Sequence, residues 1–354
     1  MDAVEPAGCF SETWAIARRR FRDAALRAGA RIDTLTLDAV GPDGDVLAID
    51  LAWLGASIPT RVLIHVSGVH GVEGFAGSAI QIQALEEGPA PAPDSALVFV
   101  HALNPYGMAW LRRVNEHNVD LNRNFIDTPS ECWSGADSLY GCLDRFLNPR
   151  RIGLIDTFYP EAVKQIARYG MRALRRAIAS GQYEYPKGLF FGGHGLEQGP
   201  ALYRRWLAEN LATAQSVFVI DVHTGLGRWA ANSLAHKRHG THRGTLPKAI
   251  ERHLVPDFEA SFYPFKGAHA NVYLQALKSA SVDFITQEFG TFSSIRVLKA
   301  LRAENQVHHS GNADISHRSK VALKDAFCPR SRAWRASIVE DGLTLFSAAA
   351  RHHI

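Results

Sequence analysis

The sequence predicts an α/β fold built around a central sheet. Two apolar runs, RVLIHVSG (61–68) and ALVFVHALNP (96–105), are expected to be buried strands, with a helix between them at SAIQIQALEEG (78–88). A strand, a helix and a second strand in this order form a βαβ unit, which is the basic element of α/β folds. The first run is too apolar to alternate, as expected for a strand that is covered on both faces.

The sequence also predicts a helix and two strands before this unit. Residues 11–30 predict an amphipathic helix that Ser11 caps and Gly29 ends. Residues 34–40 and 46–55 predict two strands that flank the turn GPDGD.

The second half of the chain continues the pattern. We expect helices at 158–181, 201–214 and 332–352, a glycine-rich loop at 185–200, and buried strands at 216–225 and 281–291. No repeat or linker interrupts the sequence, so we expect one domain over 1–354. Within it, 1–58 supplies a helix and a hairpin, and the less regular segment 127–215 is expected to cover the functional site.

Composition excludes several classes of function. The 354 residues are 46% hydrophobic, and 39 Lys and Arg against 35 Asp and Glu give a net charge of +4. The densest basic run, Arg18 to Arg20, is interpreted as a solvated helix face and not as a nucleic-acid site. No stretch has the roughly 18 apolar residues that span a bilayer, and no signal peptide is recognisable. We therefore expect a cytoplasmic protein without nucleic-acid or membrane partners.

The spacing of the four cysteines also favours a cytoplasmic protein. None of Cys9, Cys132, Cys142 and Cys328 shows C-x-x-C spacing. Free thiols in a reduced cytosol are expected, although Cys132 and Cys142 are close enough in sequence to pair in an oxidising compartment.

Three predicted strands end in side chains that can bind a metal. The first is followed by His70 and Glu73, the second contains His223 in DVHTG, and the third contains Glu288 in TQEFG. Ligands collect at the carboxyl edge of such sheets, and two His with one Glu is a common catalytic zinc set that leaves a position for water. Water bound to zinc has a pKa of about 7, and Glu288 is a suitable acceptor for its proton.

A second H-x-x-E competes with the first. HGLE places His194 three residues before Glu197, but it lies in a loop, whereas HGVE directly follows a buried strand. We therefore assign the metal to HGVE and interpret His194 as a loop or rim residue.

The segment NPYGMAWLRRVNEHNVDLNRNF (104–125) is dense in Asn and Arg. Arg112, Arg113 and Arg123 are either surface charges or partners for a carboxylate and an oxyanion, to which the planar guanidinium is suited. The tight run Asn122, Arg123, Asn124 after an aspartate favours the second interpretation.

Taken in order, H-x-x-E, NP…R…DLNRNF, DVHTG and a late Glu resemble the zinc carboxypeptidase (M14-like) superfamily. That superfamily includes the succinylglutamate desuccinylase and aspartoacylase-like deacylases. The wording of 104–125 most closely resembles its bacterial DUF2817 branch, and the resemblance covers about residues 60–310. It implies a mixed, largely parallel central sheet with helices on both faces.

The resemblance also implies roles for individual residues. His70, Glu73 and His223 match the ligands of one Zn²⁺ per chain, and Glu288 matches the general base.

The remaining matches concern the substrate. Asn122 and Arg123 match the pair that binds a terminal carboxylate, and Arg112 or Arg113 matches the residue that polarises the scissile carbonyl. We prefer Arg113 on its spacing from Asn122.

Some features depart from the superfamily. Its peptidases often have a mobile Tyr before the late Glu, but neither Tyr263 nor Tyr273 lies in a recognisable motif, and both are interpreted as packing residues. Asp221 either orients a ligand or simply ends its strand.

The leading hypothesis is a zinc hydrolase that cleaves an amide bond next to a carboxylate. Its substrate is a peptide, as for a carboxypeptidase, or alternatively an N-acyl amino acid. A non-catalytic binding module with the same fold is a second class, and a serine hydrolase is excluded because no G-x-S-x-G occurs. The sequence does not indicate an oligomeric state.

Overall fold

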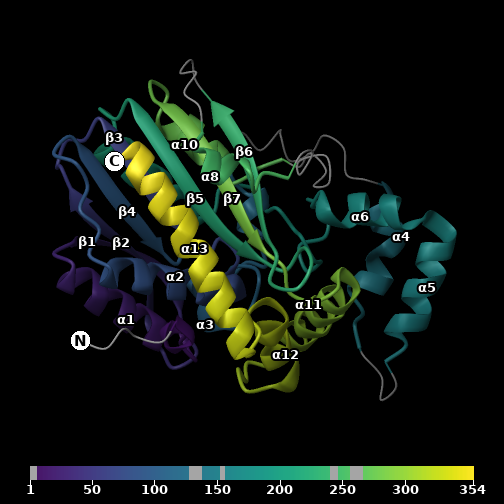
Figure 1. The fold of residues 1–354 in the computed structure, drawn as a ribbon. Coiled ribbons are helices and arrows are strands. Elements are labelled where there is room, and N and C mark those ends of the chain that lie inside the picture. The colour runs from purple at the N-terminus through teal and green to yellow at the C-terminus, as the bar shows by residue number, and fades with distance from the viewer. Residues whose placement is uncertain (1–5, 127–137, 152–155, 240–245, 256–265) are drawn as a thin grey trace.

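Seven strands form one mixed sheet at the centre of the part of the chain that the structure describes (Figure 1). The structure, a computed structural model, describes residues 6–126, 138–151, 156–239, 246–255 and 266–354. The strands are β1 (Arg31–Val40), β2 (Val46–Gly55), β3 (Arg61–Val66), β4 (Ser95–His101), β5 (Ser216–Thr224), β6 (Asn232–His239) and β7 (Ser281–Phe289).

The order across the sheet is β1-β2-β4-β3-β5-β7-β6. The four inner strands β4, β3, β5 and β7 are parallel, whereas β1, β2 and β6 are antiparallel to their neighbours. The predicted mixed, largely parallel sheet is therefore confirmed, and so is the βαβ unit, because β3 and β4 pair in parallel on either side of α2 in the chain.

Helices cover both faces of this sheet. They are α1 (Trp14–Arg27), α2 (Gly74–Glu86), α3 (Pro105–Ala109), α4 (Ser138–Leu147), α5 (Phe158–Tyr169), α6 (Met171–Ala179), α7 (Gln198–Asn210), α8 (Lys248–Glu251), α10 (Asn271–Ala276), α11 (Ser294–His309), α12 (Arg318–Phe327) and α13 (Arg332–His353). Short 3-10 turns lie at Pro6–Cys9, Gly71–Glu73 (η2) and Leu121–Arg123 (η3). None of the described helices is both long and apolar enough to cross a membrane.

The two faces can be told apart by their aromatic contacts. α1, α2 and α13 share one face, where α13 crosses in front of the strands in Figure 1 and Phe346 packs on Phe99 of β4. Trp206 of α7 packs edge-on against Trp53 of β2, which is paired with Val98. Trp53 therefore points to the same face as Val98. Since Val98 and Phe99 are consecutive in β4 and point to opposite faces, α7 lies on the face opposite to α13.

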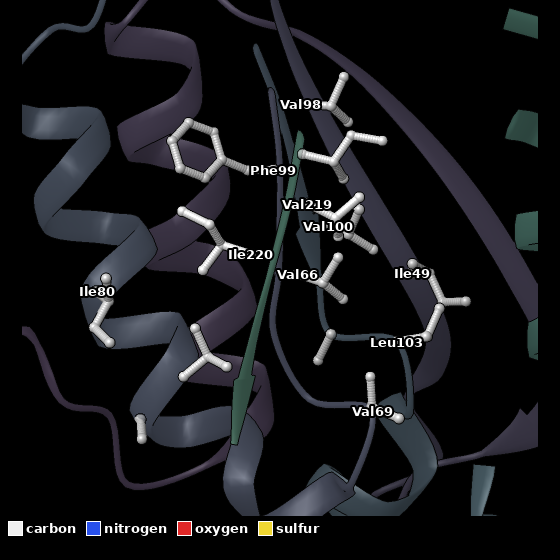
Figure 2. Packing of buried hydrophobic residues seen from close by; sticks show 14 of the residues in the cluster. Ile49, Val66, Val69, Ile80, Val98, Phe99, Val100, Leu103, Val219 and Ile220 are labelled. Carbon is white, nitrogen blue, oxygen red and sulfur yellow. The ribbon is translucent and has the colours of Figure 1, made fainter. Parts of the chain in front are cut away.

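The core follows the same alternation. Figure 2 shows Phe99 and Ile220 directed toward the helices, with Val98, Val100 and Val219 on the opposite side of the strands. All five side chains are fully or almost fully buried. Both faces of these inner strands are therefore apolar, which explains why their sequences do not alternate.

The structure corrects several predicted boundaries. Thr13, not Ser11, caps α1, because its hydroxyl accepts from the N–H of Ile16, whereas Ser11 Oγ accepts from Arg20. The helix predicted over 158–181 is two helices, because Gly170 adopts φ 76° and ψ 149°, a conformation that glycine tolerates and a helix does not.

β6 was not predicted. It is the edge strand of the sheet, pairs along its length with β7 and has an isolated bridge from Leu234 to Leu254 on its other side, so its sequence, NSLAHKRH, carries no apolar run. Gly29 does follow α1 as predicted, with φ 78°.

Two glycines allow η2 to lie against α3. A Cβ on Gly71 would lie 2.0 Å from the carbonyl carbon of Gly107. The N–H groups of Gly71 and Val72 donate to the carbonyls of Arg113 and Arg112, at 3.0 and 2.9 Å. This close backbone contact fixes the turn that carries Glu73.

We expect Gly71→Ala to lower the free energy of unfolding by about 1–3 kcal/mol or more, because backbone atoms must move to admit the methyl group. Urea unfolding measures this. Gly195→Ala is the matched control, since a Cβ there meets nothing within 4 Å, and equal stability of the two variants would contradict the close packing.

Candidate metal centre

The carboxyl ends of three parallel strands bring the candidate ligands together. His70 and Glu73 follow β3 through η2, His223 lies in β5, and Glu288 lies in β7. His223 and Glu288 are direct partners in the β5–β7 register. Because partners in a pleated sheet point to the same face, backbone pairing alone places the two side chains next to each other.

One atom from each of His70, Glu73 and His223 lies within 4.8 Å of the others. All three side chains are buried, with 2–4% of their surface exposed. The Nδ1 atoms of His70 and His223 lie 2.9 and 3.2 Å from the two oxygens of Glu73. The N–H of Thr224 donates to Glu73 Oε2 at 3.0 Å, which fixes the carboxylate.

The far sides of both imidazoles contact carboxylates. His70 Nε2 lies 3.0 Å from Asp120 Oδ1, and His223 Nε2 lies 2.9 Å from Asp221 Oδ2. An ionised carboxylate only accepts, so the two His223 nitrogens that face Asp221 and Glu73 both carry protons in the metal-free protein. Loss of the Nδ1 proton frees the lone pair that a metal needs. His70 Nδ1 is buried and lies 2.9 Å from Glu73 Oε1, but without the geometry of a hydrogen bond. Two imidazole nitrogens and one carboxylate facing a common point fit a divalent metal such as zinc.

The charges in this cluster are tightly balanced. Burial alone would raise the pKa of the Glu73 carboxyl, but His70, His223 and Arg113 hold it well below its ordinary value. Burial would lower the pKa of His223, but Asp221 and Glu73 hold it well above its ordinary value. A metal at this position therefore competes with protons, and its binding releases them.

Arg113 lies in the site. Its Nη1 donates to Glu73 Oε1 at 2.9 Å and its Nε donates to Asp120 Oδ2 at 3.2 Å. Its Nη2 is 2.8 Å from His70 Nε2. Burial lowers and the two carboxylates raise the pKa of Arg113, with a net increase, so the cation is permanent.

Arg112, by contrast, points away from the site. It is fully buried and donates to Glu304 at 2.9 Å, Asn118 at 2.9 Å and Asn305 at 3.2 Å. Lys320 contacts the same oxygen of Glu304 at 3.0 Å. The structure therefore brings Arg113, and not Arg112, to the candidate ligands.

Asn122 and Arg123 lie one turn from Asp120, in η3. Asn122 Oδ1 accepts from the N–H of His269 at 2.9 Å. Arg123 is buried, and its guanidinium donates to the carbonyls of Asn122 and Ala179. Burial lowers the pKa of Arg123 to about 10, with Asp120 opposing the decrease.

Glu288 is buried, with its Oε1 accepting from the N–H of Leu226 at 2.8 Å. Burial, followed by the negative charge of Glu73, raises the pKa of Glu288 to about 8. A carboxyl that titrates near neutral pH can both accept and return a proton.

The other sequence candidates lie elsewhere. Tyr273 is fully buried and its hydroxyl bonds that of Tyr203 at 2.8 Å, whereas Tyr263 lies outside the described residues. His194 is exposed, with Nε2 3.2 Å from the carbonyl of Tyr183, and is not near the three candidate ligands. Glu197 of the same motif contacts His117 instead.

Two residues were missed in the sequence. Asp120 contacts both His70 and Arg113, and the only signal was its place at the head of the Asn-Arg-Asn run. His269 bonds Asp221 at 2.9 Å, and nothing in the surrounding sequence AHAN indicates this.

The family model for proteins of unknown function DUF2817 matches residues 10–341. The chain belongs to this family. The membership predicted from the motifs is therefore confirmed. A search of curated proteins found no match.

Solved structures that are similar to this chain include a carboxypeptidase and a desuccinylase. Carboxypeptidase A from Helicoverpa armigera is 13% identical, with a TM-score of 0.45 over 87% of this chain and 74% of that one. The succinylglutamate desuccinylase from Chromobacterium violaceum is 14% identical, with a TM-score of 0.37 over 81% of this chain and 72% of that one.

We expect Arg112→Met to lower the free energy of unfolding by about 3–5 kcal/mol, because it breaks a buried ion pair, and to leave zinc affinity unchanged. Arg113→Met is the comparison, since it removes a contact to Glu73. Chemical unfolding and competition with a zinc chelator measure the two effects. Loss of zinc affinity in Arg112→Met would contradict the assignment of Arg113 to the site.

In metal-free protein, Glu288 should make stability depend on pH. Its pKa is about 8 in the folded chain against an ordinary value of 4.5. Its stabilising contribution is thus fully present below pH 4.5 and is lost as the pH rises through about 8.

Glu288→Gln should remove this dependence. We expect the difference in unfolding free energy, wild type minus variant, to fall between about pH 5 and about pH 8. Glu161→Gln, at a half-buried carboxylate of α5, is the control, and a difference for Glu288→Gln that does not change with pH would contradict the raised pKa.

Proposed function

We propose that this protein is a zinc-dependent hydrolase that cleaves an amide bond next to a carboxylate, as a carboxypeptidase-like metallopeptidase. The observation that carries the proposal is the buried group His70, Glu73 and His223, with Glu288 beside it in the sheet register. A non-catalytic binding module does not need a general base next to a metal set.

The zinc would be held by His70 Nδ1, Glu73 and His223 Nδ1, and when bound it supplies an activated water at neutral pH. Glu288 accepts the proton of that water and returns it to the leaving nitrogen. Its raised pKa depends partly on the negative charge of Glu73. A zinc ion bound to Glu73 would neutralise this negative charge. It would therefore favour the ionised form of Glu288, which is the form that a general base requires.

Arg113 is proposed to stabilise the oxyanion. It is a permanent cation in contact with the ligands, and its Nη1 contact to Glu73 is one that a substrate oxygen can replace. A fixed cation aimed at developing negative charge stabilises the transition state more than the ground state.

Asn122 and Arg123 are proposed to bind the substrate carboxylate. The guanidinium of Arg123 donates to the carbonyls of Asn122 and Ala179, and a guanidinium forms stronger, charge-assisted hydrogen bonds with a carboxylate. Such binding requires the guanidinium to release the carbonyl of Ala179.

Alternatively, the same site would act on an N-acyl amino acid. The ring of Phe190 lies 5.3 Å from the guanidinium of Arg113. Phe190 also has a φ of 58°, a strained conformation for a bulky residue, which indicates that surrounding contacts force it into place. A fixed aromatic ring over Arg113 favours a small substrate over a long peptide.

The segment predicted to cover the site contacts its polar residues. The hydroxyl of Tyr183 donates to the carbonyl of Arg123, and Asn124 donates to the carbonyls of Gly192 and Gly195. These contacts support a role for this segment in substrate choice. We propose a substrate with a free carboxylate and a cytoplasmic protein.

We expect Glu288→Gln to keep about one zinc per chain and to lose at least about 100-fold in kcat, because the base is removed while the ligands remain. The measurements are metal content by mass spectrometry, and hydrolysis of acyl-amino acids and of peptides with a free carboxyl terminus. Full activity of this variant, or no zinc in the wild type after dialysis against zinc, would contradict the function.

A further inference from the structure

His269 contacts the candidate metal centre from behind. It lies just before α10, is 1% exposed, and its Nδ1 is 2.9 Å from Asp221 Oδ2. The same oxygen is 2.9 Å from His223 Nε2. Two imidazoles from distant parts of the chain therefore share one carboxylate oxygen.

The other oxygen of this carboxylate has no anchor. Asp221 Oδ1 is buried and has no hydrogen-bond partner in the described structure. The orientation of the carboxylate about its last torsion therefore depends on the two imidazoles. One of them, His223, is itself the side chain that must be oriented, so His269 is the independent anchor.

The position of His269 is itself well determined. Its main-chain N–H donates to Asn122 Oδ1 at 2.9 Å. Its ring packs among four aromatic rings, with centroid distances of 5.1 to 6.2 Å. These rings belong to Phe125, Tyr203, Tyr273 and Phe284. Dense packing of this kind restricts rotation of the imidazole.

The shared oxygen decides which nitrogen of His223 faces the site. A carboxylate oxygen only accepts, so both His223 Nε2 and His269 Nδ1 carry protons. His223 Nδ1 is then the nitrogen that faces Glu73, 3.2 Å away, and loss of its proton makes its lone pair available to a metal.

We propose that His269 is a positioning residue for the metal ligand His223 and acts through Asp221. This inference rests on the metal site of the proposed function. Without the N–H of His269, the carboxylate of Asp221 is held by one hydrogen bond and rotates, and His223 loses its fixed orientation. Partners behind metal-binding histidines typically contribute about 10–100-fold to metal affinity.

The test is zinc affinity, measured by competition with a chelator. We expect His269→Ala to bind zinc about tenfold more weakly. His269→Asn should restore most of this loss, because the Asn amide nitrogen takes the place of Nδ1 and donates the same hydrogen bond. His101→Ala is the matched control: His101 is also fully buried and stacks on Phe21, but its hydrogen bond goes to Ser78, which is not one of the candidate ligands or their partners.

A double variant separates positioning from general loss of structure. If His269 acts through Asp221, zinc binds Asp221→Ala and the double variant Asp221→Ala/His269→Ala equally weakly, because effects in one chain of contacts are not additive. Additive losses in the double variant, or equal affinities of His269→Ala and wild type, would overturn the inference. So would an Asn variant as weak as the Ala variant.

These outcomes are distinct from failure of the proposed function. A wild-type protein that binds zinc but hydrolyses no amide refutes the function, while the affinity ratios still decide the role of His269. A wild-type protein that takes up no zinc refutes both.

Discussion

The carboxylate of Glu73 is the group on which the arrangement of the site depends. A buried negative charge must be paired and hydrogen-bonded to be tolerated. Its partners come from separate parts of the chain: His70 from its own turn, Arg113 from the segment after α3, and His223 and Thr224 from β5. Placing this one charge in the interior therefore requires the turn, the loop and the strand to meet correctly.

Sheet topology supplies the coarse placement and small residues supply the fine placement. Parallel β3, β5 and β7 bring their carboxyl ends to one edge. The turn after β3 then comes closer to α3 than any side chain would allow, because Gly71 meets Gly107. The backbone hydrogen bonds from this turn to the carbonyls of Arg112 and Arg113 fix the backbone that carries the two arginine side chains. Adjacent in sequence, one points to the ligands and the other to the buried ion pair with Glu304.

Much of this could be predicted from the sequence, because buried parallel strands are nearly continuous apolar runs. The inner strands and the ligand candidates at their ends were visible for that reason. β6 was not, since an edge strand can be polar. Gly170 breaks the helix predicted over 158–181, because its φ of 76° and ψ of 149° are not helical, and a single glycine inside a helical pattern does not reveal this in the sequence. His269 and Asp120 could not be assigned, because their partners are fixed only by the folded chain, and the choice between Arg112 and Arg113 depends on side-chain direction, which spacing does not determine.

The register of β5 with β7 has a consequence for how this protein can change over evolution. The separation between ligand His223 and base Glu288 is set by backbone hydrogen bonds between adjacent strands. Apart from Leu226 and His269, which contact the site, the chain that joins the two strands can therefore gain or lose residues without changing this separation. A single insertion inside either strand would instead turn its residue to the opposite face. Among relatives, we expect insertions to accumulate in the connections and to be excluded from the strands, so substrate preference can diverge while the spacing of the reactive groups stays constant.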